Sequence, residues 1–216
     1  MFEKGVYFVS GIGTGIGKSV ATGILARRLR EKGVDAITVK MVQTGNDGFS
    51  EDIELHRRLM GGVKFEEDSL GLTAPQIFRF PSSAHLAARL EGRKVDTEKI
   101  AGAVEECARR REVVLVEGAG GLMVPLDEDL LAIDFVRSVG WPVVLVFNCS
   151  LGSINHTLLS IEALKTRGMK IAALIENWAP DCDRLIEEDT PRAVRRYLDT
   201  HGLEDVPIVK VDKVEL

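Results

Sequence analysis

Residues 10–19 have the sequence Ser10-Gly11-Ile12-Gly13-Thr14-Gly15-Ile16-Gly17-Lys18-Ser19. An apolar run, residues 6–9, precedes this stretch, and a segment with apolar residues on one helical face, residues 20–30, follows it. These patterns are typical of a buried strand and of a helix. The four glycines at alternate positions let the backbone between them turn tightly and direct its N–H groups toward an anion. The stretch therefore predicts a phosphate-binding loop that joins a strand to a helix.

The residues at the start of the predicted helix support this interpretation. Lys18 can place a positive charge on terminal phosphates, and the Ser19 hydroxyl can bind Mg²⁺. The common pattern G-x-x-x-x-G-K-[ST] needs glycine where this chain has Ile12, so this loop is one residue longer. An ordinary glycine-rich turn does not require Lys-Ser at this point. The dinucleotide-binding pattern G-x-G-x-x-G fits worse, because neither possible start has glycine at its last position.

Composition limits the remaining classes of function. A chain of 216 residues with 45% hydrophobic content predicts one domain, residues 1–216, with a substantial core. The 33 acidic and 28 basic residues give a net charge of −5, which argues against a nucleic-acid partner. Neither a leader pattern nor a membrane-spanning apolar stretch is visible, so we expect a cytoplasmic protein without membrane contact. Three widely spaced cysteines predict reduced thiols rather than a zinc site or a disulfide framework.

Strand and helix patterns alternate along the chain. This alternation predicts an α/β fold of the P-loop NTPase type, with a mainly parallel central sheet and helices on both faces. Residues 66–68 are expected to be exposed, residues 76–81 to form a short edge strand, and Thr190 to cap a helix that begins at Pro191. The expected strands of the sheet are residues 6–9, 34–40, 113–116, 143–147, 170–175 and 207–211.

Charged residues follow two of these strands. Because ligands of open α/β sheets bind outside the carboxyl ends of the strands, Lys40 and residues 43–45 should face the phosphate loop. Glu117 follows the apolar run 113–116, where a buried carboxylate needs a partner or a metal ion. Asp52 is expected to cap a helix or to interact with the helix dipole from the first turn, or else to lie near Mg²⁺.

Two further features concern helices and histidines. The helix that begins near Ser153 directs its N-terminus to the same edge of the sheet and is a second candidate anion site. His56, His85, His156 and His201 are each expected to pack or cap rather than to act as bases.

Taken together, these segments resemble the dethiobiotin synthetases, a P-loop family in the same broad class as the cobyrinic acid diamide synthases and the MinD-like ATPases. The resemblance runs nearly end to end. It is carried by the loop 11–19, the segment 40–45 (Lys-Met-Val-Gln-Thr-Gly), the segment 117–121 (Glu-Gly-Ala-Gly-Gly), the segment 151–159 (Leu-Gly-Ser-Ile-Asn-His-Thr-Leu-Leu), and Asn177. The chain departs from the usual family pattern at three positions: Gly13 replaces an aspartate, Met41 a proline, and Ala84 the proline of a Ser-Pro-His segment.

The resemblance implies a reaction in which 7,8-diaminononanoate, CO₂ and MgATP give dethiobiotin, ADP and phosphate. An amine of the substrate traps CO₂ as a carbamate, ATP phosphorylates the carbamate, and the second amine closes the ureido ring. Anions must be brought together and stabilised as charge moves, which calls for cations in the site. The family also implies a homodimer that shares its substrate site across the interface.

The resemblance also implies roles for individual residues. Lys40 and Lys18 would be catalytic, with Lys40 on the carbamate and Lys18 on the transferring phosphoryl group. Ser19, Asp52 and Glu117 would hold Mg²⁺. The nucleotide would be bound by Thr14, Gly15, Ile16, Gly17, Lys18, Ser19, Val20, Glu117, Gly118, Ala119, Gly120 and Asn177, together with the loop after Val211; the substrate would be bound by Thr14, Lys40, Thr44, and Ile154 and Asn155 of the partner subunit.

Two alternatives remain open from the sequence. A switch ATPase of the MinD or ParA type carries a signature lysine five residues before the loop lysine, where this chain has Gly13. An amide-forming diamide synthase would need a glutaminase supplied by a partner. Asp52, Glu117 and the phosphate loop would serve all three, so these residues indicate nucleotide chemistry without choosing among them.

Overall fold

The computed structural model describes residues 2–178 and 182–211, and its centre is a six-stranded sheet in the order β10-β9-β8-β1-β5-β2. Every neighbouring pair in this sheet is parallel. The expectation of an α/β fold with a mainly parallel sheet is therefore confirmed. The strands are β1 (Gly5–Gly11), β2 (Ala36–Lys40), β5 (Val113–Gly121), β8 (Val143–Phe147), β9 (Ile171–Asn177) and β10 (Ile208–Val211).

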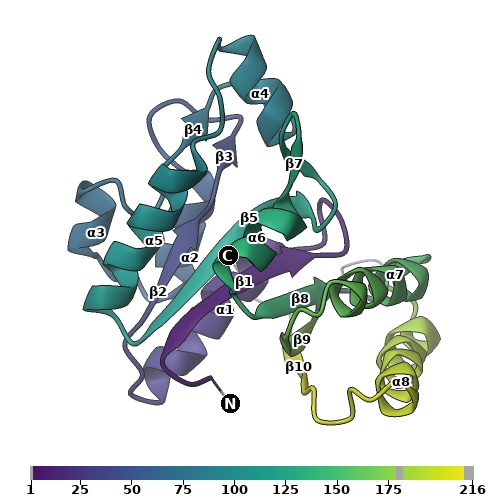
Figure 1. Cartoon of the computed structure of the whole chain (residues 1–216). Coiled ribbons are helices and arrows are strands. Elements are labelled where there is room, and N and C mark those ends of the chain that lie inside the picture. Colours follow the sequence, from purple (N-terminus) through teal and green to yellow (C-terminus); the bar gives the residue numbers. More distant parts are fainter. Residues whose placement is uncertain (1, 179–181, 212–216) are drawn as a thin grey trace.

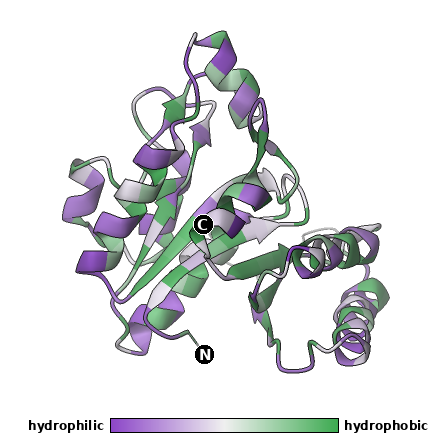
Figure 2. Ribbon diagram, in the orientation of Figure 1, coloured by the Kyte–Doolittle hydropathy of each residue, from purple (hydrophilic) through white to green (hydrophobic). Residues whose placement is uncertain are grey.

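Helices cover both faces of the sheet. In Figure 1, α5 and α6 lie in front of the sheet and α1 lies behind it. Figure 2 shows the consequence in hydropathy, because the central strands are hydrophobic while the helices carry hydrophilic residues on their outer sides. The helices are α1 (Lys18–Glu31), α2 (Glu51–Leu59), α3 (Glu66–Ser69), α4 (Ala84–Leu90), α5 (Thr97–Arg110), α6 (Ala132–Val139), α7 (Ser153–Thr166) and α8 (Arg184–Thr200). In the described part of the chain, no helix is long and apolar enough to cross a membrane.

Two small sheets lie outside the central one. The strands β3 (Gln43–Thr44) and β4 (Ile77–Phe78) pair in parallel, and β6 (Pro125–Asp127) pairs antiparallel with β7 (Leu130–Leu131). The short strand expected within residues 76–81 is therefore β4, but it pairs with β3 and not with the edge of the central sheet. This pairing holds the segment after β2 beside the segment before α4.

The structure corrects the expected start of the last helix. Asp183 is the N-cap of α8 and accepts a hydrogen bond from the backbone N–H of Leu185, so the helix begins before Thr190 and contains Pro191 in its interior. Thr190, Val194 and Leu198 are buried at intervals of four residues along one face. Burial of this face stabilises the helix, which therefore continues past Pro191. From the local sequence alone, this proline is typical of a helix start.

The acidic segment 66–68 is also not fully exposed. Glu67 is completely buried and makes a two-pronged ion pair with Arg111, at 2.8 and 2.9 Å. The expectation of exposure is wrong for this residue because its partner lies 44 positions away in the chain. A buried carboxylate is tolerated when a guanidinium satisfies both of its oxygens.

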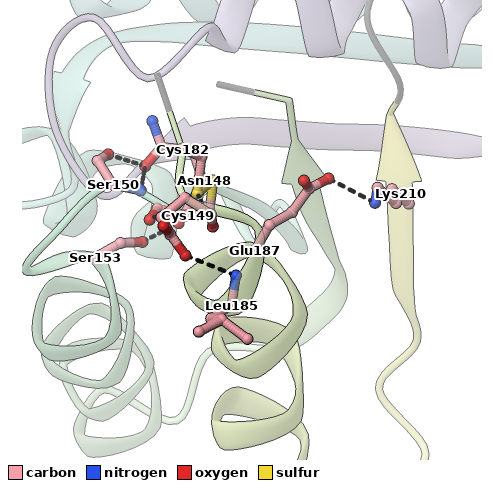
Figure 3. The surroundings of a disulfide bond; sticks show 9 residues. Asn148, Cys149, Ser150, Ser153, Cys182, Leu185, Glu187 and Lys210 are labelled. Atoms are coloured by element: carbon pink, nitrogen blue, oxygen red, sulfur yellow. Dashed lines mark hydrogen bonds and ion pairs between the residues drawn. A yellow bond between two sulfur atoms is a disulfide. The ribbon is translucent and has the colours of Figure 1, made fainter. Parts of the chain in front are cut away.

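The cysteines depart from the expectation as well. Cys149, after β8, and Cys182, before α8, form a disulfide with their Cα atoms 6.0 Å apart (Figure 3). The expectation of reduced thiols is wrong for this pair, whereas Cys107 is a free, buried thiol. A separation of 33 residues leaves no spacing signal, and only the adjacent, parallel β8 and β9 bring the two segments to the same edge of the sheet.

Candidate active site

The phosphate loop occupies residues 12–17, between β1 and α1, at the carboxyl edge of the sheet. Gly15 and Gly17 have φ of 73° and 80°, so both require the left-handed conformation that glycine adopts most easily. The Lys18 ammonium donates a hydrogen bond of 2.9 Å to the carbonyl of Gly13, across the loop. Burial lowers the pKa of Lys18 to about 8, although Glu117 and Asp52 nearby act in the opposite direction.

Asn177 joins this loop to the end of β9. Its Nδ2 donates to the carbonyl of Ile16 at 3.0 Å. A Cβ atom on Gly17 would collide with the same nitrogen, so no larger residue fits at this position without moving Asn177. Asn177, which the resemblance predicts to contact adenine, therefore also contacts the phosphate loop directly. The other predicted adenine contact, the loop after Val211, lies outside the described residues.

Three oxygen-bearing side chains converge beside the loop. The Ser19 hydroxyl lies 2.7 Å from Oδ1 of Asp52 and 2.9 Å from Oε1 of Glu117. They come from α1, α2 and β5, so the metal set expected from the sequence is brought together in space. One hydroxyl and two carboxylates are hard oxygen donors, and Mg²⁺ in nucleotide sites takes few protein ligands because it keeps waters and phosphate oxygens. This donor set fits Mg²⁺, although the described residues contain no group of three or more His, Cys, Asp or Glu side chains arranged for a metal.

Ser50, and not Asp52, caps α2. The Ser50 hydroxyl accepts a hydrogen bond of 3.2 Å from the backbone N–H of Ile53 and donates one of 2.6 Å to Gln43. Asp52 is therefore in the first helical turn, with its carboxylate directed to Ser19 and Lys40. The capping role expected for Asp52 is therefore wrong, whereas the alternative role as an acidic partner of the helix dipole agrees with its place in the first turn.

Lys40 links the two carboxylates of this set. Its ammonium lies 2.6 Å from Asp52 Oδ2 and 2.8 Å from Glu117 Oε1, and it donates to the carbonyl of Gly118 at 3.2 Å. Burial lowers the pKa of Lys40, but Glu117 and Asp52 raise it by more, so the net direction is upward. Burial raises the pKa of Glu117, yet Lys40 and His56 hold it well below its usual range. Lys40 and Glu117 are therefore both charged and belong to a buried ion cluster.

His56 is the site residue that the sequence interpretation missed. It is fully buried, and its Nε2 lies 2.7 Å from Glu117 Oε2. The only signal in the sequence is its position four residues after Asp52, which places both side chains on the same face of α2. Its partner Glu117 is 61 positions away, so the contact itself cannot be seen before folding.

Met41 shows what one departure from the family pattern does. Its side chain is buried, and its backbone N–H donates to the carbonyl of Glu117 at 2.9 Å. Proline has no N–H and cannot make this bond. The methionine therefore adds a hydrogen bond that continues the pairing of β2 with β5.

A cavity of about 770 Å³ opens over this cluster. Among the residues expected from sequence, Thr14, Gly15, Gly17, Lys18, Ser19, Val20, Lys40, Thr44, Asp52, Glu117, Ala119 and Gly120 line it. Gln43, expected to face the phosphate loop, also lines it. The remaining lining residues were not expected at the site: Val42, Leu55, Pro81, Ser82, Ser83 and Val124. Ile16, Gly118 and Asn177 are not among the lining residues but adjoin them. Gly118 accepts from Lys40, Ile16 lies between Gly15 and Gly17 in the loop, and Asn177 lies against Gly17.

The start of α7 is not part of that cavity. Ile154 and Asn155 belong to the first turn of α7, and no side chain caps this helix at its N-cap, Gly152. A second cavity, of about 380 Å³, separates α7 from the phosphate loop and is lined by Gly13, Thr14, Met123, His156 and Leu159 among others. Within one chain, the predicted substrate residues therefore form two groups.

The chain is similar to known proteins over most of its length. A family model described as an AAA domain matches residues 5–211. The ATP-dependent dethiobiotin synthetase BioD of Chlorobaculum tepidum is 45% identical over 207 residues, which cover 96% of this chain and 87% of that one. The ATP-dependent dethiobiotin synthetase BioD 2 of Pasteurella multocida is 42% identical over 197 residues, which cover 91% and 92%.

Solved structures support the fold. A ParA family ATPase from Chlorobium tepidum has a TM-score of 0.53 and 15% sequence identity, over 99% of this chain and 86% of that chain. At this identity the likeness concerns the fold alone.

Proposed function

The chain belongs to the ATP-dependent dethiobiotin synthetases, and from that premise we propose how its own residues form the ureido ring of dethiobiotin from 7,8-diaminononanoate, CO₂ and ATP. One observation carries the assignment of the site. Lys18, Lys40 and the oxygens of Ser19, Asp52 and Glu117 line a single cavity beside the phosphate loop. Such a site can hold several anions and their counterions at once.

The phosphate groups of ATP bind to the N–H groups of the loop and to Lys18. The N-terminus of α1 and the glycines with positive φ favour an anion at this point. Mg²⁺, held by Ser19, Asp52 and Glu117, supplies charge neutralisation to the phosphates when it is bound. Lys18 stabilises the charge that develops on the transferring phosphoryl group.

Lys40 holds the carbamate. A substrate amine adds to CO₂ and releases a proton, and a carbamate oxygen then attacks the terminal phosphorus of ATP, so that ADP leaves. The second amine attacks the carbonyl carbon of the resulting anhydride, and as the ring closes phosphate leaves with the proton that this amine gives up. The three protons of the Lys40 ammonium already have acceptors in Asp52, Glu117 and Gly118, so binding of a carbamate oxygen replaces one of these contacts.

The proposal includes the assembly. The first turn of α7 has no side-chain cap and no acidic residue, which favours a carboxylate. We place Ile154 and Asn155 of the partner subunit of a homodimer against the substrate carboxylate, with Thr14 and Thr44 on its amine end and Asn177 on the base of ATP. Residues 1–216 act as one domain, in the cytoplasm, where ATP is supplied.

Mass-spectrometric detection of dethiobiotin tests this function. Purified protein is incubated with 7,8-diaminononanoate, bicarbonate and MgATP, beside a reaction without the diamine. We expect product from the wild type, and a loss of about 100-fold or more in Lys40→Ala, because one stabilising donor is removed from the reacting anion. Lys170→Ala removes an exposed lysine and serves as the matched control.

Thermal unfolding and MgADP binding are measured on the same variants, because Lys40→Ala also leaves two carboxylates without their counterion. A folded, nucleotide-binding Lys40→Ala with wild-type product formation contradicts the role of Lys40. No product from the wild type, with ATP hydrolysis that ignores the diamine, contradicts the synthetase function and favours a switch ATPase.

A further inference from the structure

The two oxygens of the Glu117 carboxylate have different partners. Oε1 contacts the Ser19 hydroxyl at 2.9 Å and the Lys40 ammonium at 2.8 Å, and both of these residues line the cavity. Oε2 contacts Nε2 of His56 at 2.7 Å. Both Glu117 and His56 are fully buried, so water does not compete for this second contact. Oε2 is therefore occupied by the imidazole, and Oε1 is the oxygen in contact with residues that line the cavity.

A hydrogen-bond chain determines which ring nitrogen of His56 carries the proton. The guanidinium of Arg57 donates to the Thr38 hydroxyl at 2.7 Å, and a guanidinium cannot accept. The Thr38 hydroxyl has one proton to donate, and Nδ1 of His56 lies 3.0 Å away. The ionised carboxylate of Glu117 can only accept, so Nε2 of His56 carries the proton, and Nδ1 of the neutral ring is left to accept from the Thr38 hydroxyl.

Arg57, the first member of this hydrogen-bond chain, is held in place by several contacts. Arg57 makes two hydrogen bonds to Asp68, at 2.9 and 2.7 Å, and its guanidinium lies 4.6 Å from the centre of the Phe65 ring. Asp68 also accepts from the Thr73 hydroxyl at 2.7 Å. Arg57 therefore cannot rotate away from Thr38 without breaking several contacts.

We propose that His56 is a positioning residue for Glu117. Through the chain Arg57-Thr38-His56, it holds the carboxylate so that Oε1 alone is presented to Mg²⁺ and to Lys40. Partners that orient a metal-binding side chain in this way typically change metal affinity by about 10 to 100-fold when they are removed. Since Asp52 and His56 lie on the same face of α2, one helix both supplies one carboxylate and orients the other.

This inference rests on the proposed function only in taking Glu117 as a ligand of the Mg²⁺ that accompanies a nucleotide. Its test is therefore a binding measurement and needs no dethiobiotin. ADP binding to the full chain is measured by calorimetry at a series of Mg²⁺ concentrations and in EDTA. The readouts are the Mg²⁺ concentration for half-maximal tightening and the affinity for metal-free ADP.

Two substitutions at position 56 separate the contact from the packing. His56→Leu fills the space without a donor, and we expect it to raise the half-maximal Mg²⁺ concentration by about tenfold while the affinity for metal-free ADP stays unchanged. His56→Gln places an amide N–H near the position of Nε2 and should restore most of the wild-type value. A purely structural role predicts no such rescue.

Thr38→Val tests the chain at a distance from the carboxylate. It keeps the shape of the side chain but removes the hydroxyl, so it should raise the Mg²⁺ requirement in the same direction and by less. When Thr38→Val is combined with His56→Leu, it should have no further effect on the Mg²⁺ requirement, because His56→Leu has already removed the hydrogen bond to Glu117. Val104→Ala removes core packing in the buried face of α5, at a residue that takes no part in the hydrogen-bond chain. It therefore controls for loss of stability.

Three outcomes overturn the inference. One is an equal loss of ADP affinity with and without Mg²⁺ in His56→Leu. Another is a His56→Gln protein that is folded and as impaired as His56→Leu. The third is a Val104→Ala protein with the same shift in Mg²⁺ requirement. If His56→Leu does not fold, His56→Gln and Thr38→Val still decide. Wild-type protein that shows the expected binding but makes no dethiobiotin contradicts the proposed function and leaves this inference standing.

Discussion

Gly17 is the residue at which the phosphate loop, α1 and β9 meet. It has φ of 80° and lies against Asn177, whose amide occupies the place of a side chain. Gly33, after α1, has nearly the same φ of 83°, but no atom lies within 4 Å of the point that its Cβ would occupy. The two glycines therefore share a backbone requirement and differ in their surroundings.

This difference gives a prediction for Gly17→Ala. Gly33→Ala should lose about 1–2 kcal/mol of unfolding free energy, because alanine is strained in the left-handed conformation, and Gly17→Ala should lose more because its Cβ also displaces Asn177. Only Gly17→Ala should also weaken ADP binding, since it displaces Asn177 from Ile16. Thermal unfolding and calorimetric ADP binding of the two variants measure this. Equal ADP affinities in the two variants would contradict a role of the Asn177 contact in shaping the loop.

At the scale of elements, the pair Glu67–Arg111 joins α3 to the junction between α5 and β5. Arg111 also contacts Asp35, the residue just before β2, at 3.2 Å. Hydrogen bonds from Arg111 hold the pKa of Glu67 below its usual value of 4.5, and burial acts in the opposite direction with less effect. A carboxylate with a lowered pKa stabilises the folded state above the unfolded pKa, and this contribution is lost as pH falls through the folded pKa.

We therefore expect Glu67→Gln to reduce the free energy of unfolding by about 2 kcal/mol at pH 7. The difference from wild type should shrink as pH falls below about 4.5, where the unfolded wild-type carboxyl takes up its proton. Urea unfolding of wild type and Glu67→Gln at pH values from about 3 to 7 measures this difference in unfolding free energy. Glu66→Gln, at an exposed neighbour whose contact to Arg110 is 3.4 Å, should change little at any pH. A constant gap between wild type and Glu67→Gln across this range would exclude the pair as the source of the stability.

At the scale of the whole molecule, two large apolar side chains that line the second cavity are exposed, and a third exposed one lies just before α7. Met123 and Leu159 line the cavity and are 51% and 60% exposed. Leu151, just before α7, is 93% exposed. In the proposed homodimer, a second copy of the chain covers this surface, and its α7 completes the substrate site.

Leu159→Glu should therefore convert a dimer to a monomer in light scattering and abolish dethiobiotin formation, while ADP binding persists. A charge placed in an apolar interface remains without a partner and opposes association. Leu185→Glu, at a leucine of α8 that is 75% exposed, should leave the dimer intact. A monomeric wild-type protein, or a Leu159→Glu protein that stays dimeric, contradicts this arrangement.

Much of the fold could be predicted because its signals are local. The glycine spacing of residues 11–17, followed by Lys18 and Ser19, indicates the phosphate loop without reference to any distant residue. The apolar runs at residues 113–116 and 143–147 are long enough to require burial on both faces, and this indicates a parallel sheet. The prediction that the last helix begins at Pro191 is wrong because a non-local effect prevails. Burial of one face of α8 overrides the local preference of proline for a helix start.

The sequence by itself determined the class of the fold and the phosphate loop, and it indicated Lys40, Asp52 and Glu117 as candidate site residues, because element ends and loop chemistry depend on neighbours along the chain. Only the tertiary structure decided which oxygen of Glu117 faces the cavity, that His56 and Arg111 find buried carboxylates, and that Cys149 meets Cys182. These contacts join residues 33 to 61 positions apart. The partner of a buried polar group is set by which elements the sheet order makes adjacent, and that order is a property of the packed whole.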